Sequence, residues 1–187
     1  MPLPDGLREN RGMVPAQETC WTLIHAAAAG SAAARADFTR RYLPVARAYF
    51  GARWARSPLI AELDDAVQET FLDCFREGGA LGRAESGRRG GFRAFFFGVL
   101  RHTALQAETR KAREMERSDG ESFHPERLES DDETLSRVLD RAWAKAVVRE
   151  AAELQASRAK AAGPEAEKRA DLLRLRFQEG LPVRRRA

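Results

Sequence analysis

The strongest structural signal in the sequence is a long amphipathic pattern from Phe92 to Arg117. Apolar side chains recur there at steps of three and four residues, which gathers them on one side of an α-helix of about seven turns. The residues that share this face are Phe92, Phe95, Phe96, Val99, Leu100, Thr103 and Ala107. The pattern therefore predicts one long helix with a core-facing side.

Helix start and stop signals predict two further helices nearer the N-terminus. Thr19 is the expected N-cap of the first, and Gly30 is expected to end it. Ser31 is the expected N-cap of the second, over 32–50, whose apolar residues also form one face. Pro44 lies inside this second pattern, so we expect it to kink the helix or to shift its boundary.

A shorter helix is predicted over 65–76, with Asp64 as its N-cap. Its expected core face consists of Val67, Phe71, Cys74 and Phe75, and its opposite face of Asp65, Glu69 and Leu72. Between this helix and the long one, residues 78–91 are rich in glycine and arginine. This stretch contains no GxxxxGKS or GxxxxGKT phosphate-binding pattern, so it is predicted to be a mobile basic loop.

Composition divides the chain into four stretches. Proline and glycine among polar residues predict a flexible lead-in over 1–17, and the helices described above fall within 18–117. Residues 118–133 contain seven acidic side chains against a single arginine, which disfavours a packed core and indicates a linker. Periodic apolar positions resume in 134–187, with a break at Gly163–Pro164. Because alanine, arginine, glutamate and leucine are also abundant, we predict an all-α fold of two small helical units joined by an acidic linker.

Several classes of protein are disfavoured by the sequence. It has no GxSxG or HExxH motif and no carboxylate pair within an apolar stretch, so we expect the protein not to be an enzyme. The three histidines are scattered and the two cysteines form no CxxC pair, so neither a metal site nor a cofactor is predicted. No run of about 18 apolar residues occurs, and the cysteine usage suits a reducing compartment, so a cytoplasmic location is expected.

The side of the long helix opposite its apolar face carries Phe97 and Arg101, with Arg93 and Glu108 nearby. An aromatic ring among arginines suits nucleic acid, because the ring stacks on unpaired bases while guanidinium groups bind phosphates. The alternative is an ordinary solvated face, with Phe97 packed beneath the Arg88–Arg89 loop. Further basic residues expected to contact phosphates are Arg110, Lys111 and Arg113.

Two motifs in this order resemble those of a known family. The first is DDxxQExF, which starts at Asp64, and the second is FRAxxxGxxR, which starts at Phe92. Together they resemble region two of the extracytoplasmic-function sigma factors, which are transcription initiation subunits of bacterial RNA polymerase. This resemblance extends over about 18–117. A weaker one, over 135–183, is to the start of region four, where Phe177 precedes an EGLP sequence.

The resemblance implies a sigma factor that binds the clamp-helix coiled coil of the polymerase β′ subunit. The residues assigned to this contact are Asp65, Gln68, Glu69 and Leu72. Taken alone, the acidic positions among them are either ordinary surface or a face that docks on a basic partner helix.

The resemblance also implies that the glycine-arginine loop and the long helix hold the melted non-template strand of the minus-ten promoter element, with one base flipped into a pocket. His102 stands where the family usually has asparagine. The residues expected at this DNA interface are Arg88, Arg89, Arg93, Phe97, Arg101, His102, Arg110, Lys111 and Arg113.

Three expectations concern the rest of the chain. The acidic linker is similar to one that threads toward the polymerase active centre and mimics nucleic acid, and an anti-sigma factor is a further partner that the family allows. Region four completes a helix-turn-helix whose second helix enters the major groove, whereas this sequence stops at Ala187 before such a helix. A truncated product, a fragment and a divergent member all fit, so recognition of the minus-thirty-five element stays open. The alternative function is a helical module that docks on RNA polymerase, or elsewhere, without directing initiation.

Overall fold

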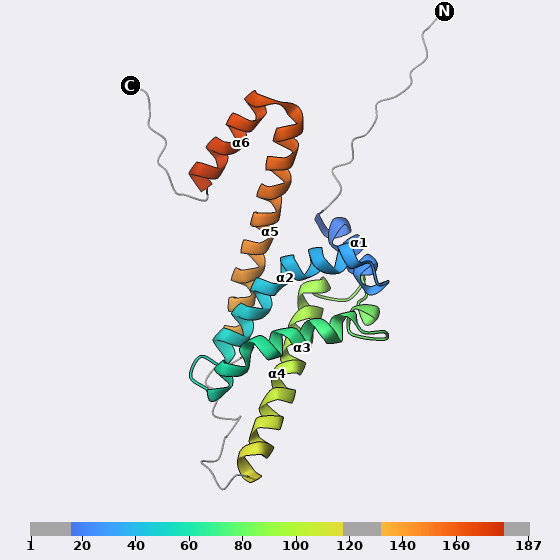
Figure 1. Ribbon diagram of the computed structural model, residues 1–187, viewed down its shortest axis with the longest axis vertical. Coiled ribbons are helices and arrows are strands. Elements are labelled where there is room, and N and C mark those ends of the chain that lie inside the picture. Colours follow the sequence, from blue (N-terminus) through green and yellow to red (C-terminus); the bar gives the residue numbers. More distant parts are fainter. Residues whose placement is uncertain (1–15, 118–131, 178–187) are drawn as a thin grey trace, which may run out of the picture.

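The computed structural model describes residues 16–117 and 132–177, and the regular structure within these ranges is helical throughout (Figure 1). The all-α prediction is therefore confirmed. Predictions for 1–15, 118–131 and 178–187 concern residues outside these ranges. In chain order the elements are α1 (Ala16–Ala28), α2 (Ala32–Arg53), the 3₁₀ helix η1 (Pro58–Glu62), α3 (Leu63–Phe75), the 3₁₀ helix η2 (Leu81–Arg83), α4 (Gly91–Arg117), α5 (Asp132–Ala162) and α6 (Pro164–Phe177).

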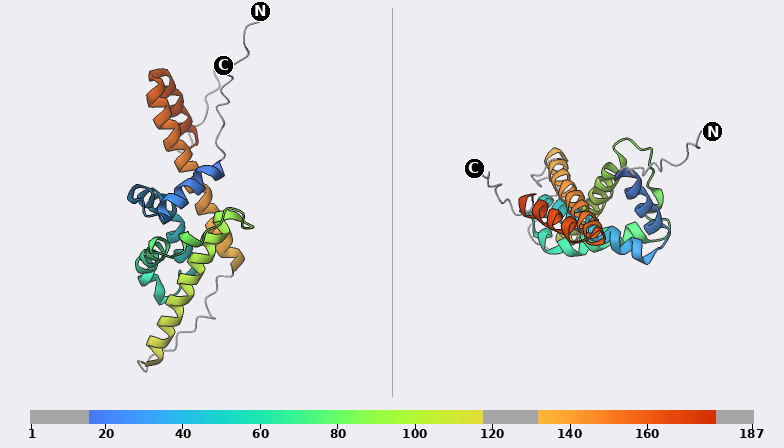
Figure 2. Two further views of the ribbon diagram at one scale, coloured as in Figure 1. Left: turned by 90° about the vertical axis from the view of Figure 1, so that its right-hand side faces the viewer. Right: turned by 90° about the horizontal axis from the view of Figure 1, so that it is seen from above.

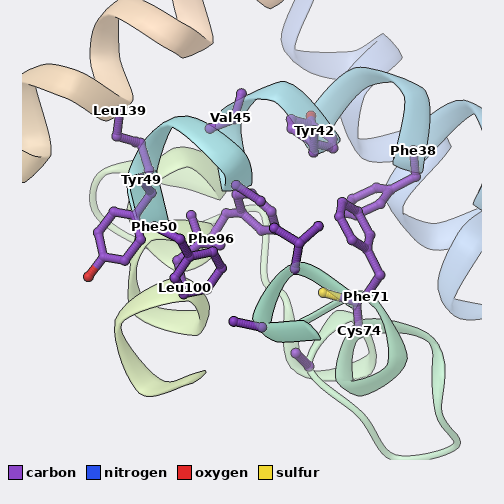
Figure 3. Close-up of a cluster of buried hydrophobic side chains, with 14 of the residues drawn as sticks. Phe38, Tyr42, Val45, Tyr49, Phe50, Phe71, Cys74, Phe96, Leu100 and Leu139 are labelled. Atoms are coloured by element: carbon purple, nitrogen blue, oxygen red, sulfur yellow. The ribbon is translucent and has the colours of Figure 1, made fainter. Parts of the chain in front are cut away.

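Helix α2 lies at the centre of the fold, in contact with α1, α3, α4 and α5. Its periodic apolar side chains are buried as predicted and meet those of α3 and α4 in one aromatic cluster (Figure 3). The ring of Phe38, for example, lies edge-on to the rings of Phe71 and Phe96, with centroids 6.1 Å away in both cases. Edge-to-face contacts of this kind stabilise a core beyond the burial of apolar area alone.

Two of the predicted N-caps are wrong and one is confirmed. Helix α1 begins at Ala16, so Thr19 lies inside it, because the residues between them are good helix formers that extend the helix upstream. Asp64 lies in the first turn of α3 because the chain already turns helical at η1, where the Ser57 hydroxyl accepts the N–H of Leu59 at 3.2 Å. The Ser31 hydroxyl does cap α2, since it accepts the N–H of Ala34 at 3.3 Å.

Two other local predictions meet mixed outcomes. Pro44 is exposed and lies inside α2, which continues past it to Arg53, so it does not set a helix boundary. Part of the predicted glycine-arginine loop is packed structure, because Leu81 is buried in η2, which contacts α1. Gly79 permits the tight entry into η2, since a Cβ atom at that position would lie 2.1 Å from the carbonyl oxygen of Asp73. Residues 85–90 of the same stretch are exposed.

The first half of α5 belongs to the same hydrophobic core as the helices before the acidic stretch. Leu135 and Leu139 are both 0% exposed in that cluster, and Trp143 packs on Tyr42 with a centroid distance of 5.0 Å. The sequence placed this helix in a separate unit and predicted an apolar face over 135–147. Most of that face is buried or partly buried, but Val147 is 45% exposed. The acidic stretch does separate two helices, but residues on both sides of it belong to one hydrophobic core.

The second half of α5 and the whole of α6 form a hairpin that projects from the rest of the molecule (Figures 1 and 2). Gly163 adopts a φ of 101° between the two helices, and Pro164 starts α6, which is the helix break that the sequence predicted. The hairpin leaves several apolar side chains exposed, among them Val148, Leu154 and Leu172. No helix among residues 16–117 and 132–177 is long and apolar enough to cross a membrane.

Candidate functional site

One exposed face of α3 brings together the residues that the sequence assigned to polymerase binding. Asp65, Gln68 and Leu72 are exposed, and Leu72 retains 62% of its accessible surface. Glu69 lies between them and is partly covered, with its Oε2 atom 3.6 Å from Nη1 of Arg110 on α4. Helical spacings of three, four and seven residues explain why the four side chains share a face. We call these four residues the α3 face.

The opposite side of α3 is held firmly in the core. Phe71 and Cys74 are buried, and burial raises the pKa of the Cys74 thiol to about 12, so this side chain stays neutral at physiological pH. At the C-terminal end of the helix, Nη2 of Arg35 donates to the carbonyl oxygen of Phe75 at 2.8 Å. This bond satisfies one of the carbonyl groups that a helix end leaves without an intrahelical partner. The α3 face is therefore presented by a rigidly packed helix.

A buried ion pair fastens α4 to the end of α2. The Glu108 carboxylate accepts Nε and Nη2 of Arg53 at 2.5 and 2.9 Å, and Nε1 of Trp54 at 2.9 Å. Glu108 is 1% exposed, and its hydrogen bond with Arg53 is the main cause that raises the pKa of the guanidinium. The sequence placed Glu108 on the outer side of the long helix, and that prediction is wrong. Its partners lie 54 and 55 residues away along the chain, so helical periodicity gave no sign of them.

Phe97 lies at the edge of the core and not on an open surface. Its ring meets the ring of Tyr49 edge-on, with centroids 5.6 Å apart, so it packs on α2 and is only partly exposed. The hydroxyl of Tyr49 is buried and makes no well-formed hydrogen bond to any residue in the described ranges. Burial raises the pKa of Tyr49 to about 12, although the nearby Arg53 acts in the opposite direction. A stacking role for Phe97 would therefore have to use whatever part of the ring Tyr49 leaves uncovered.

Two arginines of the predicted DNA interface are engaged by α5. Arg93 forms an ion pair with Asp140, and its Nη2 donates to the hydroxyl of Ser136 at 2.9 Å. Arg101 Nη2 lies 3.2 Å from Oδ2 of Asp132. Sequence reasoning did not identify the α5 residues as part of this surface. The available signal was the spacing, because the two arginines and the two aspartates are each eight residues apart.

The second half of α4 borders an open groove of about 890 Å³. The side chains that line it are Glu62, His102, Leu105, Gln106, Thr109, Arg110, Arg113, Glu114 and Arg117. Within it, His102 and Gln106 are hydrogen-bonded through their Nε2 atoms at 3.0 Å. The groove collects three of the residues predicted at the DNA interface, His102, Arg110 and Arg113, on one side of the helix.

The basic residues of the predicted DNA interface differ in whether a carboxylate of the same chain pairs with them. Lys111 lies 3.2 Å from both Glu62 and Glu114, and hydrogen bonds to these carboxylates, that to Glu114 foremost, raise its pKa. Arg88, Arg89 and Arg113 are exposed, and no carboxylate within the described residues lies at ion-pair distance from them. No carboxylate of the described residues therefore competes with a phosphate for these three guanidinium groups.

Comparisons with known proteins identify no relative of this chain. No family model, curated protein or solved structure matches the chain. Among the residues that the structure describes, no group of three or more histidine, cysteine, aspartate or glutamate side chains is arranged to hold a metal ion. The α3 face and the basic residues of α4 are the described surfaces that suit recognition of a partner by charge and shape.

Proposed function

We propose that this chain is an RNA polymerase sigma factor of the extracytoplasmic-function type, which acts in the cytoplasm without a cofactor and catalyses no reaction itself. It binds core RNA polymerase through the α3 face, and the minus-ten promoter element through α4 and the loop before it. The observation that carries the proposal is that all four residues assigned to polymerase binding share one face of a helix whose other face is buried.

The α3 face has the composition of a small docking patch. Leu72 supplies an apolar centre, and Asp65, Gln68 and Glu69 supply an acidic and polar rim around it. Protein interfaces commonly combine an apolar centre with a polar rim, and charge on the rim selects a partner of opposite sign. The expected partner surface is therefore basic with an apolar contact, and the family resemblance assigns the partner role to the clamp-helix coiled coil of the polymerase β′ subunit.

The promoter-binding part of the proposal depends on the arginines that remain open. Arg88 and Arg89 lie just before the N-terminal end of α4, and Arg113 lies near its C-terminal end. Guanidinium groups bind phosphates without reading sequence, so these residues would position the strand along α4. Base recognition would then depend on the side chains between the two ends, where Phe97 and His102 lie.

The test of polymerase docking is a charge reversal on the α3 face. Immobilised core RNA polymerase is titrated with the wild-type chain and with a variant that carries Asp65→Lys and Glu69→Lys. We expect binding at least about tenfold weaker for the variant, because two favourable contacts become repulsive at the interface. Glu77→Lys is a control that reverses a single charge away from the α3 face, since Glu77 is an exposed acid beyond the end of α3. Equal binding by all three proteins would remove the α3 face from the proposal.

A second function is favoured by one observation. Arg93, Arg101, Arg110 and Lys111 are each already paired with a carboxylate of this chain. A module that docks on polymerase without directing initiation would need no free cationic face on α4. Run-off transcription with saturating core polymerase separates the two functions, because only a sigma factor yields promoter-dependent transcripts from the complex.

A further inference from the structure

We propose that the C-terminal part of α5 binds the same helix of a second copy of this chain, as an antiparallel two-helix coiled coil. The contact surface is a stripe along one side of α5, which we call the α5 stripe. It consists of Ala144, Val147, Ala151, Leu154, Arg158 and Ala161. The inference goes beyond the proposed function, because this surface includes neither the α3 face nor any residue of α4.

The α5 stripe has the spacing of a coiled-coil seam. Its members follow one another at alternating steps of three and four residues, as the a and d positions of a heptad repeat do. All six side chains are exposed, among them Val147 at 45% and Leu154 at 51%. From residue 144 to residue 161 the helix is uninterrupted and extends over about 26 Å. The described residues thus leave a regular helix-packing surface exposed.

The two neighbouring sides of α5 are already used within the chain. On the side of α2, Ala146 is buried, and Nη2 of Arg149 donates to the carbonyl oxygen of Arg40 at 2.9 Å. Where α5 packs on α6, Ala159 is buried. Much of this part of α5 projects beyond α1–α4 (Figure 1). The α5 stripe therefore lies on a side of the helix that a second helix can approach.

The order of residues in the α5 stripe makes it complementary to itself when one copy is reversed. In one antiparallel register, Ala151 lies opposite the partner's Leu154 and Ala144 opposite the partner's Ala161. Two-fold symmetry repeats each of these layers, so every member of the stripe on one copy meets a member on the other. Small and large side chains also alternate across the central layers, which suits close packing. A second copy of the chain is therefore the occupant that the spacing fits.

Arg158 favours the antiparallel orientation of such a pair. No carboxylate of the described residues lies at ion-pair distance from this arginine. In a parallel pair the two Arg158 side chains would meet in the seam and repel each other. In the antiparallel register each lies opposite the partner's Val147, about one turn from the partner's Glu150. Glu150 pairs with Arg41 but keeps 43% of its side chain exposed, so it can also attract Arg158 of the other copy.

The association should be weak, because the α5 stripe is short and three of its six members are alanine. Val147 and Leu154 supply most of the apolar contact. A pair of this kind belongs with the transient interfaces that bury less than about 1,200 Å². We therefore expect a dissociation constant of about 10–100 µM.

The experiment measures self-association of the full-length chain by sedimentation velocity, from below to well above this dissociation constant. The test variant carries Leu154→Glu, which places a carboxylate from each copy in the central layers. The control carries Leu105→Glu, the same change at a leucine of α4 that is 44% exposed. We expect reversible dimers of the wild type and the control, and association at least about tenfold weaker for the test variant, because buried charge without a partner is costly.

Cross-linking tests the orientation of the two helices. Chains with Ala144→Cys are mixed with chains with Ala161→Cys and oxidised, and the disulfides are mapped by mass spectrometry, which separates them from any that involve Cys20 or Cys74. The antiparallel register predicts a bond between positions 144 and 161 of different copies. It predicts none between two copies of position 144, which would lie about 26 Å apart, too far for a disulfide.

Three outcomes would overturn the inference: a wild-type chain that stays monomeric throughout, equal association of the wild type and Leu154→Glu, and a bond that joins two copies of position 144. A monomeric chain whose Leu154→Glu variant binds core polymerase more weakly would instead assign the α5 stripe to polymerase. Where thermal melting shows that Leu154→Glu does not fold, Arg158→Leu takes its place. It should tighten association at least about fivefold by removing charge from the seam, and no gain would contradict the inference.

Discussion

Replacement of Glu108 by alanine tests whether a buried ion pair holds α4 on α2. The side chains of Glu108 and Arg53 are 2% and 11% exposed, so the variant leaves a guanidinium that is nearly buried and has lost its partner. Breaking a buried pair on one side typically costs about 3–5 kcal/mol, because the remaining charge is not compensated. We therefore expect the free energy of unfolding to fall by that amount. For a chain of this size, the melting temperature should fall by about 6–20 °C.

The measurement is urea unfolding followed by circular dichroism, with Glu114→Ala as the control. Glu114 lies on the same helix and pairs with Lys111 in an exposed position, so its removal should change stability by less than about 1 kcal/mol. A third variant, Arg53→Met with Glu108→Leu, removes both charges. It should recover much of the loss but not all, because Nε1 of Trp54 keeps a cost of about 1–3 kcal/mol as an unpaired donor. A loss below about 1 kcal/mol for Glu108→Ala would refute the reasoning.

Two further predictions concern the edge of the core. Tyr49→Phe removes a buried hydroxyl without a well-formed hydrogen bond, so it should raise stability at pH 7 by about 1 kcal/mol. Because folding raises the pKa of Tyr49 from 10.0 to about 12, wild-type stability should fall as pH rises through that window, and urea titrations should show a smaller fall for the variant. Phe97→Ala should lower stability by about 2 kcal/mol through lost contact with Tyr49, and an unchanged urea midpoint would contradict the packing described for this ring.

Much of the fold follows from helical periodicity. The pattern in α4 predicted the side that faces the core, apart from Glu108. The same reasoning predicted most buried positions of α2 and α3, whereas Phe75 is only partly buried. The N-caps of α1 and α3 were mispredicted because good helix formers and an upstream 3₁₀ helix moved the helix starts. The contribution of α5 to the common core was not predictable from local pattern. Its apolar face was evident, but the surface it meets on α2 is distant in sequence.

In the candidate site, too, features that depend on one helix were predictable, whereas contacts between distant parts of the chain were not. The α3 face depends on the spacing of residues within one helix, so the sequence was sufficient to group its members. The state of the cationic residues on α4 depends on partners from other elements, such as Asp140 for Arg93 and Glu69 for Arg110. Sequence reasoning treated these arginines as free surface. Their ion pairs are properties of the tertiary fold, and they are the reason why the promoter-binding role needs its own test.

The most direct test of the central proposal is in vitro transcription with purified core RNA polymerase on a library of promoter fragments. If the chain is a sigma factor, its addition should yield transcripts that start at defined positions downstream of a shared minus-ten element, and the Asp65→Lys, Glu69→Lys variant should yield few or none. The Glu77→Lys control should support the same transcripts as the wild type. Stable association with core polymerase but no promoter-dependent transcript from any fragment would contradict the proposal and favour a docking module.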